Sequence, residues 1–154
     1  MSPDQFRHLC GHFSTGVTII TTCDADRNPC GMTANSFAAV SLDPPLISVA
    51  VDHAATIYPA MLVGKFFIVN ILAANQEALS RRFADGLANR FDGVASRRDA
   101  DDQVIIADTL AHLCCEKWAA VPAGDHTIFI GRVTGGTAHD DRKPLVHYRG
   151  RYPA

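Results

Sequence analysis

The chain has 154 residues, of which 47% are hydrophobic and 19% charged, and its formal net charge is −2. This length and charge balance indicate one globular domain over residues 1–154 and give no electrostatic reason to expect a nucleic-acid partner. No apolar stretch approaches the roughly 20 residues that span a bilayer, and no secretory signal is visible, so we expect no membrane segment. The five cysteines are odd in number and lack a C-x-x-C pair. This usage favours free thiols in the reducing cytoplasm over a disulfide framework or a zinc site.

The predicted elements begin with a short helix and continue mostly as strands. Residues 2–5, Ser-Pro-Asp-Gln, form the pattern of a capped helix start, and we expect this helix to end near Thr15. The β-branched segment 17–22 predicts a strand, a turn follows, and residues 30–34 return as its hairpin partner. A third strand is expected over residues 46–51. Further along, the same reasoning predicts helices over 54–63 and 75–84, and strands over 65–72, 110–118, 127–134 and from 144 onward.

These elements favour one fold class. Strands outnumber helices and follow one another at the spacing of hairpins, which is typical of an antiparallel barrel with a few peripheral helices. The chain contains no G-x-G-x-x-G, so a Rossmann unit is not expected. Residues 85–103 are polar and predict a long surface loop. Gly135 and Gly136 permit a bend or bulge in the strand that carries them.

Several polar segments are candidates for chemistry, and each also has an ordinary structural interpretation. The segment Gly31–Ser36, with Ser41 beyond it, combines small residues with hydroxyls that could donate to a phosphate, or it could be a simple turn. The arginines at positions 81 and 82 could pair with a phosphate or form a solvated helix face. His126 follows Gly-Asp before an apolar strand and could contact a cofactor or be structural.

Two further patterns are weaker. His8 and His12 are four residues apart on the first predicted helix, but no third ligand is evident, and we expect no metal. Tyr148 and Tyr152 flank the sequence Arg-Gly-Arg, which could be an aromatic and basic wall for a nucleotide or an amphipathic last strand.

Taken together and in order, these segments resemble the flavin reductase-like family, which includes the small reductase components of two-component aromatic monooxygenases. The resemblance covers nearly the whole chain, and the ordered set of motifs is far more specific than any single motif. The matching segments are FSTGVTIITT (13–22), GMTANSF (31–37), VSLDPPL (40–46), FIVNIL (67–72), LSRRFA (79–84), GDHTIFIGRV (124–133) and PLVHYRG (144–150).

The resemblance implies a split β-barrel of antiparallel Greek-key type that binds flavin in a groove near the interface of a homodimer. It also implies NADH or NADPH as hydride donor, FMN or FAD as acceptor, and a separate oxygenase as partner. Arg82 and Phe83 would lie at the flavin phosphate, and His126 and Tyr148 where nicotinamide stacks on the flavin ring. The other cofactor-binding residues implied are Thr33, Ala34, Asn35, Ser36, Ser41, Val51, Asp52 and Thr56.

The chain departs from the family pattern in two places. Residues 53–56, His-Ala-Ala-Thr, replace a segment that is often rich in serine, so backbone contacts and Thr56 would have to hold the flavin there. Residues 85–103 also match poorly. Three other functions stay open: a flavin-binding electron carrier without nicotinamide turnover, a structural or interaction domain with a vestigial pocket, and an oxidase of the pyridoxamine-phosphate type. The last would call for a denser cluster of arginine and lysine than this chain has.

Overall fold

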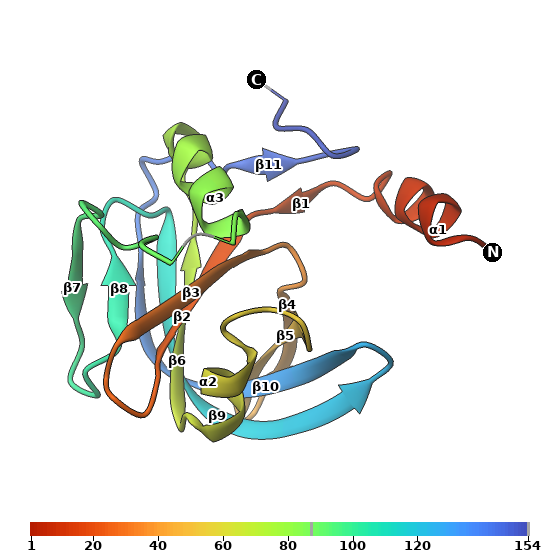
Figure 1. The fold of residues 1–154 in the computed structure, drawn as a ribbon. Helices are drawn as coiled ribbons and strands as arrows, with labels where there is room; N and C mark the ends of the chain where they lie inside the picture. The colour runs from red at the N-terminus through yellow and green to blue at the C-terminus, as the bar shows by residue number, and fades with distance from the viewer. Residues whose placement is uncertain (87, 154) are drawn as a thin grey trace.

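The computed structural model describes residues 1–86 and 88–153, and antiparallel strands form most of their regular structure (Figure 1). The strands are β1 (Thr15–Gly16), β2 (Thr18–Cys23), β3 (Pro29–Ala34), β4 (Ala38–Leu42), β5 (Pro45–Asp52), β6 (Phe66–Ile71), β7 (Ser96–Arg98), β8 (Val104–Ile106), β9 (Ala111–Ala123), β10 (His126–Ala138) and β11 (Val146–His147). The helices are α1 (Pro3–Cys10), α2 (Tyr58–Val63), the 3-10 helix η1 (Ala74–Gln76) and α3 (Glu77–Ala84). The predicted class, mainly β with few helices, is confirmed.

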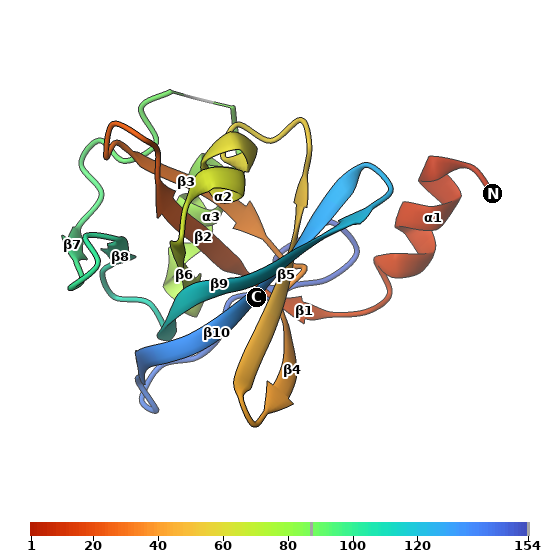
Figure 2. The same ribbon diagram turned by 90° about the horizontal axis from the view of Figure 1, so that it is seen from below.

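The central sheet has seven strands in the order β3-β2-β6-β9-β10-β5-β4. Figure 2 shows it from below, with the β4–β5 hairpin and the tip of the β9–β10 hairpin extending in different directions. The sheet curls until β3, one edge strand, contacts β5 near the other edge. Ser36, just after β3, bonds to the backbone of Ala50 in β5 and holds this closure.

Two apolar clusters lie on opposite faces of β2. Because successive side chains of a strand point to opposite faces, Ile20 packs in the first cluster and Ile19 in the second. The first fills the interior of the curled sheet and includes Phe67 and Phe129. The second lies under α3. Both faces of β2 are therefore buried, which explains why its sequence is apolar or β-branched without an alternating polar face.

Helix α1 stands away from the rest of the chain (Figures 1 and 2). Its capping box is present: the Gln5 N–H donates to Ser2 Oγ at 3.2 Å, and the Ser2 N–H donates to Gln5 Oε1 at 2.9 Å. The helix ends at Cys10, earlier than predicted, with Gly11 at its C-cap. None of its residues is buried, and Phe6 and Leu9 are 59% and 57% exposed. No helix in the described ranges is long and apolar enough to cross a bilayer.

Residues 85–103 are not the continuous loop that the sequence predicts, because β7 lies within them and pairs with β8. Arg98 donates to the Asp102 carbonyl at 2.6 Å and stabilises the turn between the two strands. The pattern was missed because every β7 side chain, Ser-Arg-Arg, is exposed, so no apolar alternation marks the strand. Residues of β8 are buried on the sheet, where the Ile106 N–H donates to Asn70 Oδ1 at 2.9 Å.

Three other boundaries differ from the prediction. Helix α2 begins at Tyr58, because residues 52–57 form turns in which the Asp52 carboxylate accepts from the Ala54 N–H at 2.8 Å. The strands predicted over 110–118 and 127–134 extend into one long hairpin of β9 and β10. The predicted irregularity at the glycine pair is confirmed, since the β9–β10 register shifts between Val133 and Gly135.

Candidate functional site

The end of β3 and the connection to β4 carry four of the predicted flavin contacts. The Thr33 hydroxyl donates to the Ser80 carbonyl of α3 at 2.6 Å, and Ala34 is buried. Ser36 Oγ accepts from the Ala50 N–H and donates to the Ala50 carbonyl, both at 3.0 Å. Asn35 is exposed, and its side chain has no hydrogen bond to another described residue. Thr33 and Ser36 therefore shape this segment, while the Asn35 amide is available to a ligand.

The segment after β5 comes next to β3 in space. Val51 is fully buried, and the Asp52 carboxylate is occupied in the turn described above. Thr56 is exposed and lines a cleft of about 320 Å³ together with Gly31, Gly86, Ala88, Arg90 and Phe91. The structure thus brings Thr56 next to the first residues of β3, and its contact with flavin stays a prediction.

Arg90 lies in this cleft and was not among the predicted site residues. Its guanidinium is buried and donates to the Gly31 carbonyl at 2.7 Å. Phe91 lines the same cleft and packs edge-on against Phe83, with ring centroids 4.9 Å apart. No sequence signal marked Arg90, because it sits in a polar segment rich in Arg and Asp that predicts a surface loop.

Neither Arg82 nor Phe83 lines this cleft, although Phe83 packs directly behind it against Gly31 and Phe91. Arg82 Nη2 donates to the carbonyls of Asn89 at 3.0 Å and Asp92 at 2.6 Å, so the guanidinium ties residues 89–92 to α3. Phe83 is 1% exposed and belongs to the cluster under α3. A Cβ at Gly31 would lie 2.8 Å from the Phe83 ring, which shows how closely β3 crosses it. In this structure Arg82 and Phe83 hold neighbouring segments in place, and their role at the flavin phosphate stays a prediction.

Ser41 is also separated from the other predicted residues. It lies near the β4–β5 turn, opposite Leu46, whereas Asp52 lies at the other end of β5. Six residues of extended strand place the two ends about 20 Å apart. Within one chain, Ser41 therefore does not join the cleft that Thr56 lines.

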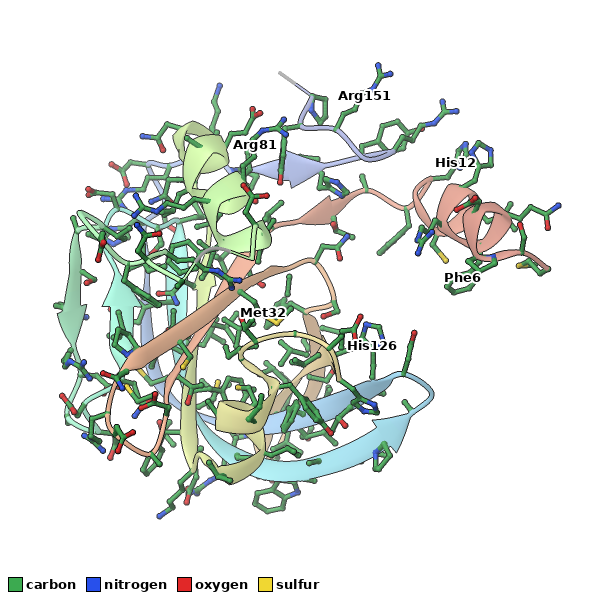
Figure 3. The ribbon with its side chains drawn as sticks, in the orientation of Figure 1. Phe6, His12, Met32, Arg81, His126 and Arg151 are labelled. Atoms are coloured by element: carbon green, nitrogen blue, oxygen red, sulfur yellow. The ribbon has the colours of Figure 1, made fainter. Side chains whose placement is uncertain are left out.

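His126 begins β10, opposite Asp52 of β5, and its side chain is labelled in Figure 3 at the mouth of the curled sheet. Its Nδ1 lies 2.7 Å from Asp125 Oδ1. This hydrogen bond to His126, supported by the charges of His126 and His53, holds the pKa of Asp125 below its ordinary value. Tyr148 is not beside His126: it packs edge-on near His12, just after α1, with ring centroids 6.5 Å apart.

A hydroxyl network beside His126 was also missed. Thr127, buried, lies 3.0 Å from His53 Nε2 and 3.0 Å from the Tyr58 hydroxyl. The His53 N–H donates to the Asp125 carbonyl at 3.0 Å. The network joins the segment after β5, which carries Thr56, to the start of β10, which carries His126. It links residues 69 and 74 positions apart, and no local sequence pattern could indicate it.

Among the described residues, no three His, Cys, Asp or Glu side chains come together as a metal-ligand group. The side chains at the mouth of the sheet are instead hydrogen-bond donors, one buried guanidinium and two histidines. Such a set suits an organic ligand with phosphate and amide groups.

Comparison with known proteins identifies the class to which this arrangement belongs. The family model for the flavin reductase-like domain matches residues 10–154. The chain belongs to this family. The predicted resemblance is thereby confirmed.

Several individual proteins of this family are similar to the chain. The FMN reductase (NADH) SmoA of Agrobacterium fabrum is 39% identical, over 96% of this chain and 83% of its own length. HsaB of Rhodococcus jostii, the reductase subunit of a flavin-dependent monooxygenase, is 36% identical, over 99% of this chain and 77% of its own length. The solved NADH:FAD oxidoreductase SgcE6 of Streptomyces globisporus, in complex with NAD and FAD fragments, superposes with a TM-score of 0.93 at 37% identity, covering 98% of this chain and 91% of that one. Some relatives are much longer: the chain spans 42% of one from Rhizobium meliloti that is 41% identical over 86% of this chain.

Proposed function

We propose that the protein is an NADH-dependent flavin reductase that transfers a hydride from the nicotinamide to FMN or FAD. The observation that carries this proposal is the cleft that Thr56 and Arg90 line together, with His126 at the mouth of the same curled sheet. The family membership and the named activities of SmoA and SgcE6 support it.

The residues present fit a flavin nucleotide. Asn35 and Thr56 offer exposed polar groups without internal partners among the described residues, and Arg90 supplies a cation in the cleft that Thr56 lines. Phosphate is bound best where a guanidinium and neutral donors converge. We therefore assign the phosphate end of the flavin to Thr56 and Arg90, and a polar edge of the flavin to Asn35.

When flavin and nicotinamide are bound together, they supply the hydride acceptor and donor, and the protein needs no acid–base dyad of its own. The task of the chain is orientation. His126 is fixed by Asp125 and by the backbone pairing of β10 with β5, so its ring can form one wall of the nicotinamide site. The Thr127 network holds the segment that carries Thr56 at a constant distance from that wall.

The test separates flavin binding from nicotinamide binding. Thr56→Ala should raise the flavin Kd several-fold and leave the NADH KM unchanged, because it removes only a phosphate contact. His126→Ala should raise the NADH KM or lower kcat while the flavin Kd stays at the wild-type value. Thr137→Ala, an exposed change at the far end of β10, is the control and should alter neither. Stopped-flow absorbance of oxidised flavin and flavin fluorescence titration provide both readouts. A wild-type protein that binds flavin but leaves it oxidised with NADH and NADPH would refute the proposal.

We also infer that two copies of the chain form a homodimer. Phe6, Leu9 and Phe13 are 59%, 57% and 78% exposed, so α1 and the residues just after it present apolar surface that no described residue covers. The outward face of β5 and β10 adds Ala50 and Ile128, which are register partners. A stable dimer buries such surface with a gain of about 25 cal/mol per Å².

Light scattering coupled to gel filtration tests the dimer. The wild-type chain should elute with twice the mass of one chain, and Phe13→Glu should shift it toward one. Val63→Glu, at a 74% exposed apolar position on α2, is the matched control and should leave the mass unchanged. A wild-type monomer at micromolar concentration would contradict the inference.

The biological setting follows from the same relatives. HsaB is the reductase subunit of a monooxygenase, and we infer that this chain likewise supplies reduced flavin to a separate oxygenase. The described structure contains five free cysteines, which supports a reducing compartment such as the cytoplasm.

A further inference from the structure

A second cleft, separate from the one that Thr56 lines, lies between α1 and the C-terminal turn. Its volume is about 920 Å³, within the range of nucleotide sites. Figure 3 shows the two sides, with His12 labelled on the α1 segment and Arg151 on the turn. The side chains that define it are Arg7 and His8 of the helix, and Tyr148, Arg149, Arg151 and Tyr152 of the turn.

The turn is held in a fixed conformation. Tyr148 and Arg151 are bridge partners, with N–H to carbonyl distances of 2.9 and 3.0 Å. The two central residues, Arg149 and Gly150, have φ of 50° and 74°, as in a two-residue hairpin turn of type I′. The Arg149 N–H also donates to the Gly11 carbonyl at 2.9 Å and joins the turn to the end of α1. The two arginines that flank Gly150 are therefore displayed on a preorganised backbone.

The cleft is basic although the chain carries a net charge of −2. Asp4 is the single acidic residue of its lining, and it pairs with Arg7 at 3.0 Å. Arg149 and Arg151 are exposed and form no ion pair with a described carboxylate. Two unpaired guanidiniums on one turn are suited to bidentate binding of a diphosphate.

The aromatic lining adds a surface for a planar base. The Tyr152 hydroxyl lies 2.8 Å from Ser80 Oγ, and the Arg81 guanidinium lies 4.9 Å from the centroid of the Tyr152 ring. Both contacts are with residues of α3, so they hold Tyr152 in place. Tyr148 is 37% exposed, and Arg149 lies 6.0 Å from its ring centroid. A tyrosine next to an arginine is a common stacking platform for a nucleobase.

We propose that this cleft binds the adenosine diphosphate moiety of a nicotinamide dinucleotide, with Arg149 and Arg151 on the phosphates and Tyr148 stacked on the adenine. The proposal rests on the proposed function for the identity of the dinucleotide. It extends that function by assigning a site for the half of the molecule that takes no part in hydride transfer.

The experiment uses ADP itself as the probe. Isothermal titration of the full-length protein with ADP is compared with that of the double variant Arg149→Asn/Arg151→Gln, in which asparagine suits the positive φ. The variant should bind ADP about tenfold more weakly or worse. The control Arg97→Gln/Lys143→Gln removes two exposed charges elsewhere and should bind ADP as the wild type does. Thermal unfolding confirms that each variant is folded.

Two further measurements test the assignment to the nicotinamide nucleotide. In the double variant the NADH KM should rise while the FMN and FAD Kd values stay constant. A double variant that binds FAD more weakly, with FMN binding unchanged, would overturn the assignment. No ADP binding by the wild type, or equal binding by the double variant, would overturn the proposal. ADP binding needs neither flavin nor turnover. A lack of reductase activity would therefore refute the proposed function without changing the outcome of the ADP titration.

Discussion

Replacing Ser36 by alanine tests whether one hydroxyl closes the curled sheet. Ser36 Oγ both accepts from the Ala50 N–H and donates to the Ala50 carbonyl, each at 3.0 Å. Each hydrogen bond contributes about 1 kcal/mol net to the free energy of unfolding. Water can replace only part of this bonding at a half-buried site, so we expect the substitution to lower the free energy of unfolding by about 2 kcal/mol. For a domain of this size such a loss lowers the Tm by about 4–8 °C.

The assay is urea and thermal unfolding followed by circular dichroism, with flavin titration in parallel. The flavin Kd should also rise, because the same bonds hold the segment that presents Asn35. Ser41→Ala is the control: its hydroxyl has no hydrogen-bond partner among the described residues, and its stability should stay within about 0.5 kcal/mol of wild type. A Ser36→Ala protein as stable as that control would refute the assignment of closure to this residue.

Three other predictions concern the interior. Asn70→Leu should cost about 3 kcal/mol in denaturant unfolding, because the fully buried Asn70 amide donates to the Ile19 carbonyl and accepts from the Ile106 N–H, which would lose their partners. Burial, together with the nearby positive charges, lowers the pKa of His112 from its ordinary 6.5. As pH falls below 6.5, His112 therefore takes up a proton in the unfolded chain before it does so in the folded chain, and the free energy of unfolding should fall. The Tm should accordingly decrease with decreasing pH, and His112→Gln should make this decrease smaller. Burial raises the pKa of Cys115 to about 12, so Ellman's reagent at pH 8 should leave it unmodified in the folded protein while the exposed Cys10 reacts; rapid labelling of Cys115 would contradict this.

The sequence predicted those elements whose cause is local. The capping box at Ser2 and the β-branched run of β2 depend on neighbouring residues, and the structure confirms both. Strand β7 escaped prediction because its exposed Ser-Arg-Arg side chains carry no apolar period, and only pairing with β8 makes it a strand. The sequence pattern therefore predicts an element when local caps or burial determine the residues that form it. It does not predict a strand that forms only because its backbone pairs with another strand.

The candidate site shows the same division at the level of single residues. The segments that surround it could be predicted by resemblance, but the direction of each side chain could not. Arg82 turns toward the carbonyls of Asn89 and Asp92, and Arg90, eight positions later, reaches the cleft. The link from His53 through Thr127 depends on the register of β10 with β5, which only the folded sheet determines.

The isolated position of α1 has a consequence for how the protein responds to dilution. A helix of eight residues does not persist in water by its own hydrogen bonds, since nucleation costs more than so few turns recover. Its order must therefore be thermodynamically linked to whatever surface its aromatic side chains contact. Amide hydrogen exchange in this segment should accelerate as protein concentration falls, while exchange in the central sheet stays unchanged. The rate of amide exchange in α1 would thus report on the proposed self-association of the chain.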